Sequence, residues 1–146
     1  MLFRRIMFAS DGSPASLKAA EAVARIAATN QETTVTVVVT LPKELVGEPN
    51  SESDVAQQRK IRSHAERALI ATGAVFQRWG IPHDDRLVTG DCACTAVAKA
   101  AREDMSDLIA MNCTEHAFTP EGKASNNLTA EVMQRAHVPV LVIPVS

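Results

Sequence analysis

Three cysteines and a histidine are the residues of this chain best suited to bind a metal or to react as nucleophiles. They occur as Cys92-Ala93-Cys94 and as Cys113-Thr114-Glu115-His116. A zinc site would need both segments, but Cys-x-Cys is not the usual Cys-x-x-Cys spacing of structural zinc sites. Cys92 is better placed for thiol chemistry, because it opens a predicted helix and a helix N-terminus favours the thiolate. We prefer the simpler interpretation, in which a small residue begins a helix and no metal is bound.

A hydrolase would need a serine, a histidine and an acid at one point. Ser13, Asp11 and His116 are the residues that such a site would use. However, Ser13 is followed by Pro14, a pair typical of a helix N-cap and first helical position. The chain also has no Gly-x-Ser-x-Gly motif, which marks the nucleophile of many hydrolases. We therefore expect no catalytic residues.

Strands and helices must alternate along the chain to position these residues. Short apolar runs predict strands at about 4–10, 34–41, 85–90, 107–112 and 138–145. Amphipathic segments predict helices at about 14–28, 54–79, 92–103 and 127–136, with Asp91 as the cap of the third. This alternation is typical of βαβ units and predicts a parallel α/β sheet in one domain covering residues 1–146.

The composition limits the classes of protein and partner. The chain has 146 residues, a net charge of −2 and no basic block, which argues against nucleic acid as a partner. No apolar run approaches the ~20 residues of a membrane helix, and MLFRRIMFAS is read as the first strand rather than a signal peptide. An odd number of cysteines without a secretory signal predicts free thiols and a cytoplasmic location.

Several segments, in this order, resemble the universal stress protein (UspA) family. They are RIMFASDGSPAS, VTGDCACTAVAKAA, SDLIAMN and RAHVPVLVIPV. The resemblance covers essentially the whole chain. It implies a Rossmann-like, adenine-nucleotide-hydrolase-like fold: an open five-stranded parallel sheet in the order 3-2-1-4-5 with helices on both faces. In that order, a ligand crevice lies beyond the carboxyl ends of the first and fourth strands.

The resemblance also implies which residues surround the crevice. Ser10 and Asp11 follow the first strand, and Asp11 matches the acidic residue at the nucleotide crevice of ATP-binding members. An Asp that only shapes the Asp-Gly-Ser turn needs no ligand, and both interpretations stay open. Thr40 matches the position at which the protein backbone contacts the adenine edge in ATP-binding members. Gly90 matches a position near the sugar, although a tight turn explains it better.

The loop after the fourth strand lies where ATP-binding members carry their phosphate loop. Their pattern is Gly, two residues, Gly, nine residues, then Gly followed by Ser or Thr. Here Asn112, Glu115 and Asn126 stand at the three glycine positions, Asn127 replaces the Ser or Thr, and ten residues separate Glu115 from Asn126. Asn112 and Asn126 suit a left-handed backbone conformation better than most residues do.

Glu115 is the change least compatible with a phosphate. Its repulsion of an anion about 4 Å away costs roughly 1–4 kcal/mol, whereas a helix N-terminus contributes only ~0.3–1 kcal/mol at an exposed site. Lys123 is the single cation of the loop. We therefore interpret the segment as a degenerate ATP loop.

The last predicted strand suggests a dimer. An apolar strand at the edge of a sheet is prone to pair with another chain, and a copy related by a two-fold axis would cover it. The residues that we expect at this interface are Val140, Leu141, Val142, Ile143 and Val145. The alternative is a monomer whose edge is protected by Pro144 and by its short length.

The sequence thus predicts a non-catalytic stress-response or binding protein that forms a homodimer. Its partners would be itself, unidentified proteins and a small-molecule ligand, without nucleic acid, membrane or required cofactor. The alternative is an ATP-binding member that uses Asp11 and the Asn112–Asn127 loop for nucleotide-gated association or slow hydrolysis. A third class is a thiol or redox protein that uses Cys92 or Cys113.

Overall fold

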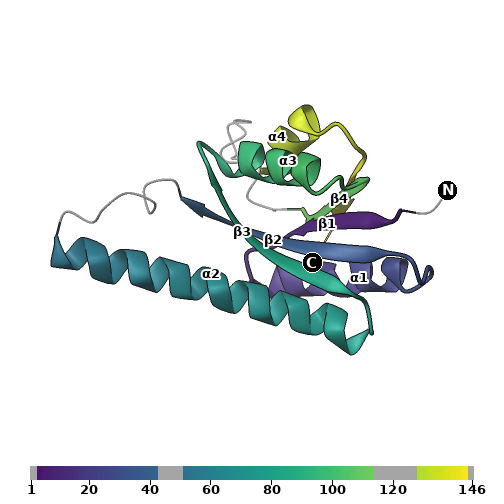
Figure 1. The fold of residues 1–146 in the computed structure, drawn as a ribbon, viewed down its shortest axis with the longest axis horizontal. Coiled ribbons are helices and arrows are strands. Elements are labelled where there is room, and N and C mark those ends of the chain that lie inside the picture. The colour runs from purple at the N-terminus through teal and green to yellow at the C-terminus, as the bar shows by residue number, and fades with distance from the viewer. Residues whose placement is uncertain (1–2, 43–50, 114–127, 145–146) are drawn as a thin grey trace.

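The computed structural model describes residues 3–42, 51–113 and 128–144. Five parallel strands form one sheet in the order β3-β2-β1-β4-β5 (Figure 1). The strands are β1 (Arg5–Ala9), β2 (Thr34–Pro42), β3 (His83–Gly90), β4 (Leu108–Asn112) and β5 (Val140–Ile143), and the helices are α1 (Pro14–Ala27), α2 (Glu52–Arg78), α3 (Ala93–Glu103) and α4 (Leu128–Arg135). The predicted fold class and strand order are confirmed.

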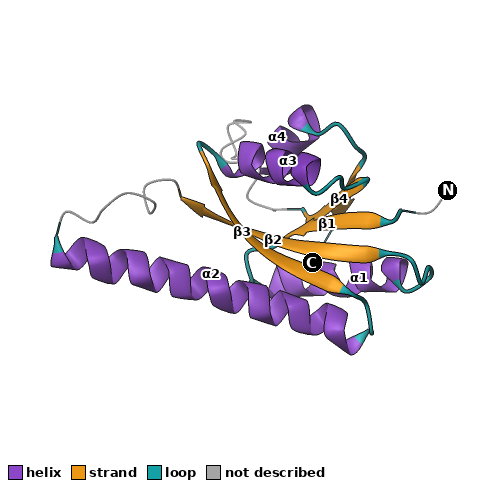
Figure 2. Cartoon of the chain, in the orientation of Figure 1, coloured by secondary structure: helices purple, strands orange, loops and turns teal. Residues whose placement is uncertain are grey.

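Helices cover both faces of the sheet, with α1 and α2 on one face and α3 and α4 on the other (Figure 2). Successive strand residues point to opposite faces. In β1, Ile6 and Phe8 pack toward α1 and α2, whereas Met7 and Ala9 pack toward α3 and α4. Burial on both faces explains why the central strands are continuous apolar runs.

Local signals set the ends of two helices. Ser13 caps α1, its hydroxyl accepting a hydrogen bond from the Ser16 N–H, and Pro14 takes the first helical position as predicted. The cap of α3 is Cys92, so the prediction of Asp91 was wrong. The Cys92 sulfur accepts from the Thr95 N–H at 3.4 Å and so satisfies one of the amides in the first turn of α3.

The strand β5 lies at one edge of the sheet and pairs with β4. Its four residues are all half-buried. Leu141 and Ile143 pack against the core on the α1 and α2 side, and Val140 packs against the core on the α3 and α4 side. None of the helices in the described ranges is long and apolar enough to cross a membrane.

Candidate functional site

A cavity of about 70 Å³ lies where β1 and β4 end, at the point where the strand order reverses. Ligands of open α/β sheets bind at such switch points. Four residues expected from the sequence line this cavity: Ser10, Asp11, Thr40 and Asn112. We call it the switch-point cavity. Its other lining residues are Ala9, Ser16, Val38, Val97, Met111 and Leu128.

The turn after β1 is held against α2. Gly12 has a φ of +77°, and a Cβ placed there would lie 2.6 Å from the Ala68 Cβ, so this position requires glycine. The Thr72 hydroxyl donates to the Ala68 carbonyl at 2.7 Å, so its hydrogen bond with Ser10 at 2.8 Å must be donated by Ser10. Since Ser10 Oγ also accepts from the Gly12 N–H, this hydroxyl is engaged within the protein.

Asp11 is held by two serines. Its Oδ1 accepts from the Ser13 N–H at 2.9 Å and from the Ser16 hydroxyl at 2.7 Å. Partial burial acts to raise the pKa of Asp11, but the hydrogen bonds from Ser13 and Ser16 outweigh it and lower the pKa below the ordinary value of 3.8. Asp11 therefore remains a carboxylate that both shapes the turn and borders the cavity.

Asn112 links β4 to the same cluster. Its Oδ1 lies 3.1 Å from Ser16 Oγ, and its carbonyl accepts from the Thr129 hydroxyl at 3.4 Å. Asn112 is paired with Ile143 in the sheet, so its backbone is extended and does not use the left-handed conformation that asparagine tolerates. Glu115, Asn126 and Asn127 lie outside the described residues, as does Val145 of the expected interface.

A second cavity, of about 290 Å³, lies beside the first and shares Thr40 with it. We call it the β2–β3 cavity, and its lining includes Gly90, Asp91 and Cys92. At Gly90 a Cβ would lie 3.1 Å from the Ala96 Cβ and 3.3 Å from the Cys92 carbonyl oxygen. This crowding supports the tight-turn explanation of Gly90.

Two residues of the site were not singled out from the sequence. Ser16 is 1% exposed and contacts both Asp11 and Asn112. Thr72 is fully buried and fixes Ser10. The available signal was a polar side chain on the buried stripe of a helix, because a polar group at such a position needs a hydrogen-bonding partner.

The cysteines differ from the expectation of free thiols. The structure joins Cys92 and Cys94 by a disulfide, so that expectation was wrong for both, whereas Cys113 is free and exposed. The sulfurs of Cys92 and Cys94 and a carboxylate oxygen of Glu131 lie within 4.8 Å of one another. In the part of the chain that the structure describes, Cys113 does not belong to this group, and His116 lies outside that part.

The sequence model of the universal stress protein family matches residues 2–144, almost the entire chain. The chain belongs to the universal stress protein family. This universal stress protein is 25% identical over 142 residues to "Universal stress protein MJ0531" of Methanocaldococcus jannaschii, an alignment that covers 97% of this chain and 82% of that protein.

Solved structures of the family share its fold. One is a universal stress protein in complex with cAMP, with a TM-score of 0.77 and 21% identity over 100% of both chains. Another is the universal stress protein from Archaeoglobus fulgidus in complex with dAMP, with a TM-score of 0.65 and 17% identity over 98% of this chain and 99% of that one.

Proposed function

We propose that this universal stress protein is a non-catalytic binding protein whose switch-point and β2–β3 cavities take the adenosine part of a nucleoside monophosphate. The observation that supports this proposal most directly is the cavity at the switch point, which is lined by Ser10, Asp11, Thr40 and Asn112. Thr40 also lines the β2–β3 cavity and so connects the two. The relatives in complex with cAMP and dAMP support this ligand class. Volumes of about 70 and 290 Å³ suit a nucleoside divided between two adjoining cavities.

The charges around the cavities favour a ligand with few phosphates. Asp11 and Asp91 contribute carboxylates, and among residues 3–42, 51–113 and 128–144 no lysine, arginine or histidine lines either cavity. Glu115 adds a further negative charge to the sequence of the loop after β4. Since each phosphate of ATP adds negative charge, these carboxylates favour AMP over ATP.

We infer the lack of a catalytic role from the hydrogen bonds that the polar side chains of the site already make. The proton of Ser10 goes to Thr72, and Ser16 Oγ lies 2.7 Å from the carboxylate of Asp11. Asp11 itself accepts two hydrogen bonds and has a lowered pKa, so it is a poor general base at neutral pH. We infer that the cluster shapes a binding surface and activates no nucleophile.

Calorimetric titration with AMP, with cAMP and with ATP plus Mg²⁺ tests this proposal. We expect AMP or cAMP to bind at least about tenfold more tightly than ATP, a difference of about 1.4 kcal/mol. Glu115→Gly should strengthen ATP binding, and Glu115→Gln separates the charge from the loss of the side chain. Equal micromolar affinities for ATP and AMP would support the ATP-binding alternative, and no binding of any of the three would refute the nucleotide proposal.

We also propose a homodimer formed by pairing of the β5 edges. The Ile109 N–H donates to the Pro139 carbonyl and the Cys113 N–H donates to the Ile143 carbonyl. The alternation of a parallel ladder then directs the N–H groups of Val140 and Val142 away from β4. Pro144 lies at the next outward position and lacks an N–H, so it removes no bond to β4 but offers no donor to the partner strand, which Val140 and Val142 must supply.

Sedimentation at micromolar concentration tests the dimer, with Val142→Lys as the variant, because lysine on an edge strand opposes pairing with another chain. We expect wild type to sediment as a dimer and the variant as a monomer. A wild-type protein that stays monomeric would refute the homodimer.

We also propose that the protein lies in the cytoplasm and binds other proteins. Cell fractionation tests the location, and cross-linking in cells tests the binding.

A further inference from the structure

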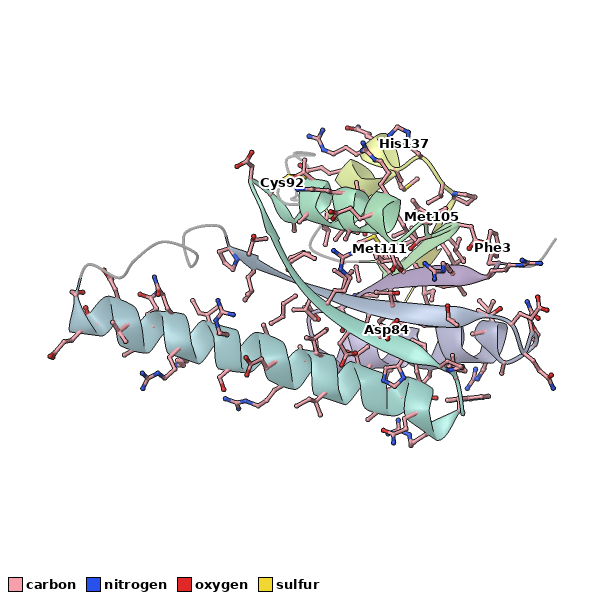
Figure 3. The ribbon with its side chains drawn as sticks, viewed as in Figure 1. Phe3, Asp84, Cys92, Met105, Met111 and His137 are labelled. Atoms are coloured by element: carbon pink, nitrogen blue, oxygen red, sulfur yellow. A yellow bond between two sulfur atoms is a disulfide. The ribbon has the colours of Figure 1, made fainter. Side chains whose placement is uncertain are left out.

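We propose that Cys92 and Cys94 form a reversible thiol–disulfide site, in which Cys92 reacts with low-molecular-weight disulfides and Cys94 completes the exchange. The pair begins α3, beyond the end of β3 (Figure 3), and Cys92 lines the β2–β3 cavity. Neither sulfur is needed for the nucleotide proposal, so the two ideas can fail separately.

The two sulfurs differ in access. Cys92 is half-buried and lines the β2–β3 cavity. Cys94 is 1% exposed and packs in the core between α3, α4 and the sheet. An incoming disulfide can therefore reach Cys92 but not Cys94, which assigns the first attack to Cys92 and the second step to Cys94.

The surroundings stabilise negative charge on both sulfurs. Cys92 is the N-cap of the eleven-residue helix α3, and its Sγ accepts from the Thr95 N–H at 3.4 Å. The Arg135 Nε donates to Cys94 Sγ at 3.4 Å from α4. Helix N-termini and guanidinium groups both favour a thiolate, the form that attacks a disulfide. A carboxylate oxygen of Glu131 lies within 4.8 Å of both sulfurs, and its negative charge offsets part of this stabilisation of the thiolates.

The exchange balances with a small disulfide RSSR as the oxidant. The Cys92 thiolate attacks one sulfur of RSSR, forms a mixed disulfide and releases RS⁻. Cys94 then loses its proton, and its thiolate attacks Cys92 Sγ and displaces the second RS⁻. Two protein thiols are oxidised to one disulfide, RSSR is reduced to two thiols, and the two protons end on the two RS⁻ groups. The reverse sequence reduces the site.

Metal binding is the less favoured use of the same residues. Within the described residues the group offers three ligands, Cys92, Cys94 and Glu131, whereas structural zinc almost always takes four. The structure also bonds the two sulfurs to each other, and a metal-binding cysteine is a thiolate. The geometry therefore favours exchange chemistry.

The test uses the Cys113→Ser protein, so that the pair supplies its only thiols. The reduced protein is treated with glutathione disulfide and followed by intact mass. We expect loss of both free thiols and a final mass about 2 Da lower, reversed by dithiothreitol. With Cys94→Ala added, Cys92 should instead hold one glutathione. With Cys92→Ser added, which keeps a favoured helix cap, Cys94 should remain unmodified while the protein is folded.

Three results would overturn the proposal. The first is that the reduced pair keeps both thiols in glutathione disulfide. The second is that glutathione attaches to Cys94 in the folded Cys92→Ser protein as fast as it attaches to Cys92. The third is that the reduced protein takes up one zinc ion and this blocks the disulfide, which would assign the pair to metal binding. Circular dichroism of each variant confirms that the comparison is between folded proteins.

Discussion

Replacing Gly12 by alanine should destabilise the protein through two separate effects. A φ of +77° costs a residue with a Cβ about 1–2 kcal/mol. The new Cβ would also lie 2.6 Å from the Ala68 Cβ and 2.9 Å from the Ala68 Cα, and overpacking of this kind costs about 1–3 kcal/mol. We expect Gly12→Ala to lower the free energy of unfolding by about 2–5 kcal/mol in total.

Gly80 provides a matched control. Its φ is +68°, but no heavy atom lies within 4 Å of the position of its Cβ. Gly80→Ala should therefore cost only the conformational part, about 1–2 kcal/mol. Both substitutions change the entropy of the unfolded chain similarly, so the difference between them measures the contact with Ala68.

Urea unfolding of both variants gives the two free energies, provided that the slopes against urea concentration match that of wild type. Adding Ala68→Gly removes the nearest atom but leaves the Cα at 2.9 Å. It should therefore recover part of the loss in Gly12→Ala and none in Gly80→Ala. Equal losses in the two single variants, or no coupling between Gly12 and Ala68, would refute the close approach of the turn to α2.

Three further substitutions test the cluster and the core. Ser16→Ala should cost about 1–3 kcal/mol in urea unfolding, since it removes the hydrogen bond to the buried side chain of Asn112, and should raise the pKa of Asp11, read by NMR titration. Because the folded pKa of Asp11 lies below 3.8, its carboxylate stabilises the fold above about pH 4 and this contribution is lost as the pH falls through the folded pKa. The stability difference between wild type and Asp11→Asn should therefore shrink toward pH 3, and a constant difference would contradict the assigned hydrogen bonds. Phe76→Ala should cost about 3–5 kcal/mol, because Phe76 is fully buried with its ring 6.0 Å from that of Phe8; a loss below 1 kcal/mol by thermal unfolding would contradict this packing.

The sequence by itself determined the features that depend on neighbouring residues. Apolar runs separated by amphipathic segments gave the alternation of strands and helices. Ser13 and Pro14 marked the start of α1, and the amphipathic spacing marked α2, where Ala65, Leu69 and Phe76 are all buried. These signals are readable because capping and helical periodicity act within a few residues. The strand order came from the family resemblance, since neighbours in a sheet are distant in the chain.

Only the tertiary structure decided which polar groups meet. Ser16 lies 96 residues from Asn112 in sequence and 3.1 Å from it in space, and no local pattern encodes that contact. Asn112 tolerates a left-handed backbone in isolation, but pairing with Ile143 holds it extended. The access of Cys92 and the burial of Cys94 likewise depend on α4 packing over α3. Local preferences amount to about 1 kcal/mol per residue, and the ladder and the packed core override them wherever the two conflict.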